Sequence, residues 1–139
     1  MKSISVFGST GSVGGQTLEL IGASPEAFEV AVLTGGRNVA LLAEQALAVG
    51  ARTAVIADEA LTQDLRDALA GSSIEAIGGR QALIESAGRP VVWVMSAVVG
   101  FAGLEMSLAA AKSTSVLALA NKESLVCGGG LLPELCAKH

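Results

Sequence analysis

Short apolar runs and amphipathic segments alternate along the 139-residue chain, and glycines separate many of them. The apolar runs predict strands at residues 3–8, 28–34, 53–58, 74–78, 91–96 and 115–120. The segments between them predict helices at 12–23, 38–50, 58–71, 80–88 and 102–113, and a further helix from residue 121. This alternation predicts an α/β fold, a Rossmann-like doubly wound and mainly parallel sheet with helices on both faces.

Apolar positions recur at helical spacing in the first three predicted helices, so these positions are expected to face the sheet. Asn38 and Asp58 are expected to cap the second and third helices. The expected inward positions are Val13, Thr17 and Ile21, then Val39, Leu42, Ala46 and Val49, then Leu61, Leu65 and Leu69.

The mean hydropathy of +0.59 is high, and it favours either a membrane segment or a sheet buried on both faces. The longest uncharged apolar stretch, residues 91–104, is shorter than the ~20 residues that span a bilayer. No secretory signal follows Lys2, so a cytoplasmic location without membrane attachment is expected, with Cys127 and Cys136 as reduced thiols. The net charge of −4, without a basic cluster, argues against nucleic-acid binding.

The stretch FGSTGSVGG joins the first predicted strand to the first predicted helix. Gly8, Gly11 and Gly14 follow a G-x-x-G-x-x-G spacing, a variant of the dinucleotide-binding loop. Free N–H groups and the helix dipole at such a place attract a pyrophosphate, to which Thr10 and Ser12 can add hydroxyl donors. The alternative is an ordinary tight turn without a ligand.

The end of the second predicted strand indicates which dinucleotide binds. NAD sites usually carry an acidic residue about 20 residues past the glycines. Here the sequence reads LTGGRN, and no carboxylate occurs between Glu29 and Glu44. Arg37 stands in that place, and a guanidinium matches phosphate geometry, so the sequence predicts NADP(H) bound through its 2′-phosphate. The alternative is a solvated loop arginine.

The last predicted strand ends in the polar residues Asn121, Lys122 and Glu123, at the edge where α/β sheets bind ligands. A helix cap explains Asn121, and a favourable dipole interaction explains Glu123. Lys122 opposes the helix dipole, so it is predicted to meet an anion.

GSTGSVG, GGRN, SAVVGFAGL and ANKESLV occur here in that order, and together they resemble the 1-deoxy-D-xylulose 5-phosphate reductoisomerase family of the non-mevalonate isoprenoid pathway. The resemblance covers essentially the whole chain, and ANKESLV is its most specific motif. It implies that the chain binds NADPH, and that Lys122 reaches a sugar-phosphate substrate. The cofactor contacts it implies are Thr10, Gly11, Ser12 and Val13 for the pyrophosphate and ribose, Gly36, Arg37 and Asn38 for the 2′-phosphate side, Ala97 and Val98 beside the cofactor, and Asn121 and Glu123 for the nicotinamide half.

Members of this family are longer, and their divalent-metal (Mg or Mn) motif lies downstream of ANKESLV. No Asp follows Asp67 here, and His139 is the only histidine. Residues 1–139 are therefore expected to be the NADPH-binding domain alone, without metal ligands or catalytic residues. The expectation is that this fragment does not turn over, and that the full-length enzyme is a homodimer.

Two other functions fit some of the same residues. A second NADP oxidoreductase, such as aspartate-semialdehyde dehydrogenase, has a similar glycine loop and uses a nucleophilic cysteine, for which Cys127 is the candidate. The third possibility is a stand-alone module that senses NADP(H). The dehydrogenase alternative leaves NKES unexplained, whereas the NADP(H)-sensing module is compatible with every motif above.

Overall fold

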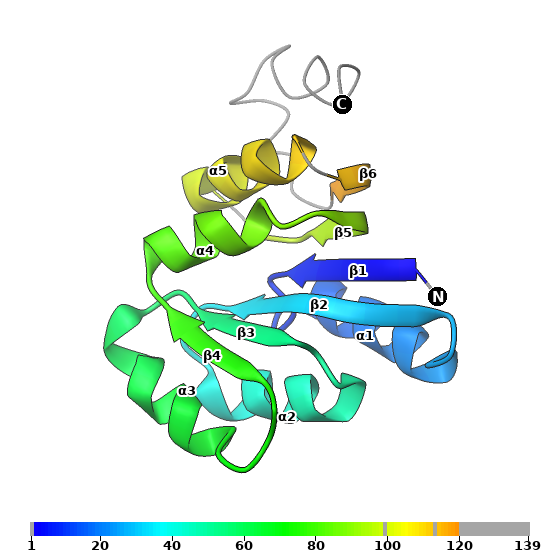
Figure 1. The fold of residues 1–139 in the computed structure, drawn as a ribbon. Coiled ribbons are helices and arrows are strands. Elements are labelled where there is room, and N and C mark those ends of the chain that lie inside the picture. The colour runs from blue at the N-terminus through cyan, green and yellow to red at the C-terminus, as the bar shows by residue number, and fades with distance from the viewer. Residues whose placement is uncertain (1, 99, 113, 120–139) are drawn as a thin grey trace.

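The computed structural model describes residues 2–98, 100–112 and 114–119 (Figure 1). The strands are β1 (Lys2–Phe7), β2 (Phe28–Gly35), β3 (Thr53–Ile56), β4 (Glu75–Gly78), β5 (Val91–Ser96) and β6 (Thr114–Leu119). The helices are α1 (Ser12–Ala23), α2 (Val39–Val49), α3 (Thr62–Ala68), α4 (Arg80–Ala87) and α5 (Gly100–Ala111), with a short 3₁₀ helix η1 (Glu59–Leu61) before α3. The helix predicted from residue 121 lies outside the described residues.

The strands form one six-stranded sheet in the order β4-β3-β2-β1-β5-β6, and every neighbouring pair is parallel. The chain therefore moves outward from β1 in one direction through β2, β3 and β4. It then returns to pair β5 with the other side of β1. This reversal beside β1 is the topological switch point at which open α/β sheets bind ligands.

Two apolar cores lie on opposite faces of the sheet. One gathers residues of α1, α2 and α3, among them Leu18, Leu42 and Leu65, and the other gathers residues of α4 and α5, among them Leu83 and Met106. Figure 1 shows α4 and α5 together beside β5 and β6, away from α1 and α2. Burial on both faces explains the high mean hydropathy, and no helix in the described ranges is long and apolar enough to cross a membrane.

The inward face of α1 differs from the predicted one. Val13 is 42% exposed, and the buried positions are Gly14, Leu18 and Ile21. A Cβ on Gly14 would lie 2.2 Å from the Gly8 carbonyl oxygen, so the helix packs onto its own entry turn through a glycine. Val13, although apolar, is thereby left exposed.

Both predicted helix caps are present, but one of them caps a different element. The Asn38 side chain accepts a hydrogen bond from the Leu41 N–H at 3.1 Å and caps α2. The Asp58 side chain accepts from the Ala60 N–H at 3.1 Å, and it caps η1 rather than α3. The third helix is thus shorter than predicted, because a 3₁₀ turn takes up its first residues.

Candidate dinucleotide site at the carboxyl edge of the sheet

The loop between β1 and α1 turns sharply at Gly8, whose φ of +77° favours glycine. The Gly11 N–H donates to the Gly8 carbonyl at 3.1 Å and closes the turn. Gly8 also lies against the next loop, since a Cβ there would be 3.0 Å from the Ala97 carbonyl oxygen and 3.3 Å from Val98 Cγ2. The fold itself therefore requires glycine at position 8, as it does at position 14.

Gly11 and Gly36 have no comparable requirement from the fold. Gly11 has an extended backbone (φ −83°, ψ 175°), and a Cβ on it would make only an ordinary contact of 3.5 Å with the Gly8 carbonyl oxygen. A Cβ on Gly36 would meet nothing within 4 Å, and Gly36 has no positive φ. Packing thus leaves both glycines unexplained, and both line the same cavity.

That cavity has a volume of about 230 Å³ and lies where β1, β2, β3 and β5 end. It brings together the predicted residues Gly11, Gly36, Ala97 and Val98. The loops after β1 and β5 are joined by a hydrogen bond from the Ala97 N–H to the Phe7 carbonyl at 2.9 Å. The lining residues are Gly8, Gly11, Thr34, Gly35, Gly36, Ala57, Leu83, Ala97, Val98 and Met106.

The amino end of α1 opens beside this cavity. Gly11 occupies the N-cap position, and no side chain there bonds to the first turn. The first N–H groups of a helix have no acceptor within the helix, so those of Ser12, Val13 and Gly14 remain available to a ligand. Together with the helix dipole they favour an anion at this place. Thr10 lies next to the second loop, because a Cβ on Gly35 would be 3.1 Å from its Cγ2.

The loop between β2 and α2 holds the cationic part of the site. Arg37 Nε lies 3.3 Å from Asp58 Oδ2, and the Arg37 side chain is 82% exposed. Asp58 also donates its own N–H to the Gly36 carbonyl at 3.2 Å. Nε is the guanidinium nitrogen that makes this contact. The Asn38 side-chain oxygen is engaged as the α2 cap, so its contribution to a ligand would come from other atoms.

The sequence did not predict that Asp58 pairs with Arg37. The acidic residue of an NAD site belongs at the end of β2, whereas Asp58 follows β3 and comes to Arg37 only through strand pairing.

Asn121, Lys122 and Glu123 lie outside the described residues. The hydrogen bond from Arg80 to Glu105 raises the pKa of Arg80, but neither residue lines the cavity.

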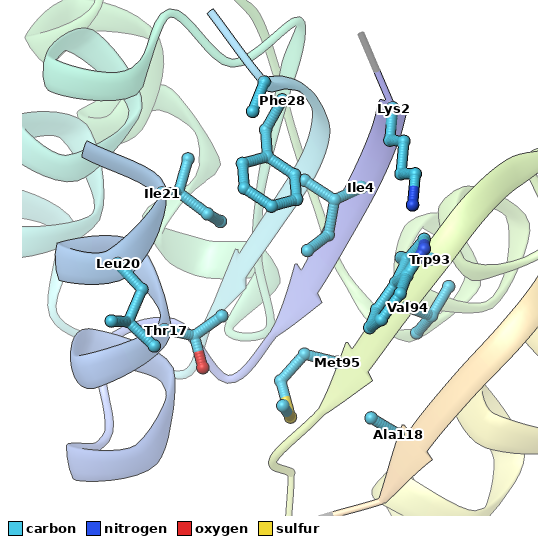
Figure 2. Close-up of a pocket in the computed structure, with 11 residues that line it drawn as sticks. Lys2, Ile4, Thr17, Leu20, Ile21, Phe28, Trp93, Val94, Met95 and Ala118 are labelled. Carbon is cyan, nitrogen blue, oxygen red and sulfur yellow. The ribbon is translucent and has the colours of Figure 1, made fainter. Parts of the chain in front are cut away.

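A larger, apolar hollow of about 500 Å³ lies elsewhere, between α1 and the strands β1 and β5 (Figure 2). Figure 2 shows Leu20 and Ile21 of α1 facing Met95 across it, with Lys2 next to Trp93. Lys2 Nζ lies 5.6 Å from the centre of the Trp93 ring. None of the predicted site residues lines this hollow, and it provides few polar groups, so it is a poor candidate for a dinucleotide.

No three His, Cys, Asp or Glu side chains gather as a metal site within residues 2–98, 100–112 and 114–119. The described residues therefore supply no ligand set for a divalent cation.

The parallel sheet, its switch point and the glycine-lined cavity define an α/β domain of the Rossmann-like, dinucleotide-binding class. The chain belongs to the 1-deoxy-D-xylulose 5-phosphate reductoisomerase family, which matches it over residues 4–129. The family and fold predicted from the sequence are thereby confirmed, and the aspartate-semialdehyde dehydrogenase and sensor alternatives are not favoured.

Individual relatives agree with this assignment. The 1-deoxy-D-xylulose 5-phosphate reductoisomerase of Ruegeria sp. (strain TM1040) is 52% identical over 139 residues, and that of Rhodospirillum centenum (strain ATCC 51521 / SW) is also 52% identical over 139 residues. The chain covers 35% of the length of each. The enzyme of Zymomonas mobilis, solved in complex with NADPH, superposes with a TM-score of 0.95 at 46% identity over 99% of this chain and 36% of that one. A reductoisomerase solved with fosmidomycin and magnesium gives a TM-score of 0.92 at 34% identity, over 100% of this chain and 35% of the other.

Proposed function

We propose that this chain is the NADPH-binding domain of a 1-deoxy-D-xylulose 5-phosphate reductoisomerase. Gly11 and Gly36 carry the proposal, because packing requires neither to be glycine and both line the cavity at the switch point. A bound dinucleotide supplies the missing reason, since its phosphates and ribose need close approach to a bare backbone. The NADPH complex of the Zymomonas mobilis relative supports the same assignment.

In this proposal each loop has a distinct part of the cofactor to hold. Thr10, Gly11, Ser12 and Val13 take the pyrophosphate and adjoining ribose through N–H groups and hydroxyls. Gly36, Arg37 and Asn38 take the 2′-phosphate side of the adenosine, Ala97 and Val98 lie along the cofactor, and Asn121 and Glu123 contact the nicotinamide half.

The guanidinium of Arg37 explains a preference for NADPH over NADH. Its fork of N–H donors suits the oxygens of a phosphate, and the 2′-hydroxyl of NADH offers no such charge. Asp58 pairs with Nε, so in this proposal the other guanidinium N–H groups meet the phosphate.

The activity proposed for the whole protein is the isomerisation of 1-deoxy-D-xylulose 5-phosphate and its NADPH-dependent reduction to 2-C-methyl-D-erythritol 4-phosphate. The cofactor supplies hydride when bound, and Lys122 binds the sugar phosphate. The divalent metal that the family uses would take its ligands from outside the described residues. Homodimer formation stays a prediction of the family resemblance, and a cytoplasmic location stays a prediction of the sequence.

A Gly11→Val substitution tests the cofactor assignment. The extended backbone at Gly11 accepts a branched residue, so the fold should survive with a loss of about 1 kcal/mol, because Val is a poorer N-cap than Gly. We expect NADPH binding, measured by calorimetry, to disappear. Gly22→Val is the matched control, since Gly22 is exposed on the same helix with nothing within 4 Å of its Cβ position, and it should bind normally. Normal binding by Gly11→Val would mean that the loop is only a turn.

A further inference from the structure

Gly8 and Ser9 are held by hydrogen bonds to Thr34 of β2 and Gln45 of α2. The Gly8 N–H donates to Thr34 Oγ1 at 2.9 Å, and the Ser9 N–H donates to the Thr34 carbonyl at 2.9 Å. Gln45 of α2 makes two further bonds to Ser9. Its Nε2 donates to the Ser9 carbonyl at 2.9 Å, and its Oε1 accepts from the Ser9 hydroxyl at 2.9 Å.

This cluster is polar although most of it is buried. Ser9 is fully buried and Thr34 is 2% exposed, whereas Gln45 is half-buried. Buried polar groups weaken a fold unless each finds a partner, and here each finds one. The turn itself is already closed by the bond from the Gly11 N–H to Gly8. The added polar contacts therefore fix where the loop lies relative to β2 and α2.

Thr34 also stands directly before Gly35, Gly36 and Arg37 in the chain. It contacts the pyrophosphate loop with its hydroxyl and carbonyl, and it leads into the loop proposed for the 2′-phosphate. Thr34 thus sets the separation between the pyrophosphate loop and the loop proposed for the 2′-phosphate.

We infer that Thr34 and Gln45 are positioning residues for the dinucleotide, an inference that rests on the proposed function. A glycine-rich loop has unusually large backbone freedom to lose. Because the cluster orders Gly8 and Ser9 during folding, less ordering remains when the cofactor binds, and affinity rises accordingly. Neither residue needs to touch the cofactor for this effect.

The inference predicts that changes at Thr34 and Gln45 weaken the binding of both dinucleotides, whereas the role proposed for Arg37 affects NADPH alone. Thr34→Val keeps the shape of the side chain but removes the acceptor for the Gly8 N–H. We expect it to weaken NADPH and NADH binding alike by about three- to tenfold, the loss expected for one hydrogen bond. Thr34→Ser keeps the hydroxyl oxygen, so it should bind NADPH and NADH with the affinities of the unmodified protein. Gln45→Met should weaken both cofactors in the same way.

The test is calorimetric titration of NADPH and NADH into the protein and each variant. The temperature is kept well below the midpoint of thermal unfolding of every protein tested. Gln63→Met is the matched control, since Gln63 is exposed on α3 and bonds only to Asp67 among the described residues, and it should change neither affinity. If Thr34→Val does not fold, the less buried Gln45→Met decides the matter. Folded variants that bind both dinucleotides like the unmodified protein would overturn the inference, as would a failure of Thr34→Ser to restore binding. If the unmodified protein itself binds neither dinucleotide, the proposed function is what fails.

Discussion

Arg37→Ala removes the cation proposed to meet the 2′-phosphate and leaves Asp58 without its ion-pair partner. A charge-assisted hydrogen bond contributes about 1.5–3 kcal/mol. The Arg37 side chain is 82% exposed, so solvent screening places the effect at the lower end. The Asp58 carboxylate that remains adds a small repulsion toward the phosphate. Since about 1.4 kcal/mol is a factor of ten, we expect NADPH affinity to fall about tenfold.

NADH affinity should stay unchanged in the same variant, because NADH lacks the 2′-phosphate. The unfolding free energy should change by less than about 1 kcal/mol, as an exposed ion pair contributes little. Arg52→Ala is the matched control, since Arg52 is also exposed but pairs with Glu29 and lines no part of the cavity. Calorimetric titration of both dinucleotides gives the comparison, and the effect should shrink at high salt. An unchanged ratio of NADPH to NADH affinity would refute the role assigned to Arg37.

Two further substitutions test other parts of the account. Gly14→Ala should destabilise the fold by about 1–3 kcal/mol in urea unfolding, because its Cβ would lie 2.2 Å from the Gly8 carbonyl oxygen, whereas Gly15→Ala, with nothing within 4 Å, should be neutral or stabilising. Equal effects of the two would contradict the close packing of α1 on its entry turn. Lys122→Ala in the full-length enzyme should raise the KM for the sugar phosphate or lower kcat while leaving NADPH affinity nearly unchanged; weaker NADPH binding would place Lys122 in the cofactor site instead.

The sheet could be predicted from the sequence because burial on both faces leaves continuous apolar runs such as VVWVMS in β5. The alternation with helices predicted the parallel arrangement, and the glycine positions indicated the loop at which a dinucleotide would bind. The inward face of α1 was predicted wrongly at Val13, because spacing alone gives no information about a glycine that packs against backbone. The start of α3 was also misplaced, since a capping Asp opens a 3₁₀ turn as readily as an α-helix.

The contacts that support the site could not be predicted, because they join residues far apart in the chain. Thr34 and Gly8 are 26 residues apart, and Gln45 and Ser9 are 36 apart. Asp58 likewise reaches Arg37 only through the pairing of β2 with β3. A sequence pattern shows which loops carry glycine and arginine, whereas the partners that hold these loops emerge only once the strands are placed side by side.

Amide chemical shifts followed during an NADPH titration test the central claim most directly, because they report every loop of this 13.9 kDa chain at once. The account predicts that the largest changes fall on residues 8–13, 36–38 and 97–98, around the cavity at the ends of β1, β2, β3 and β5. Residues around the apolar hollow, such as Leu20 and Trp93, should change little. Changes centred on that hollow, with the glycine loops unaffected, would contradict the proposed site, and a titration without any change would contradict NADPH binding itself.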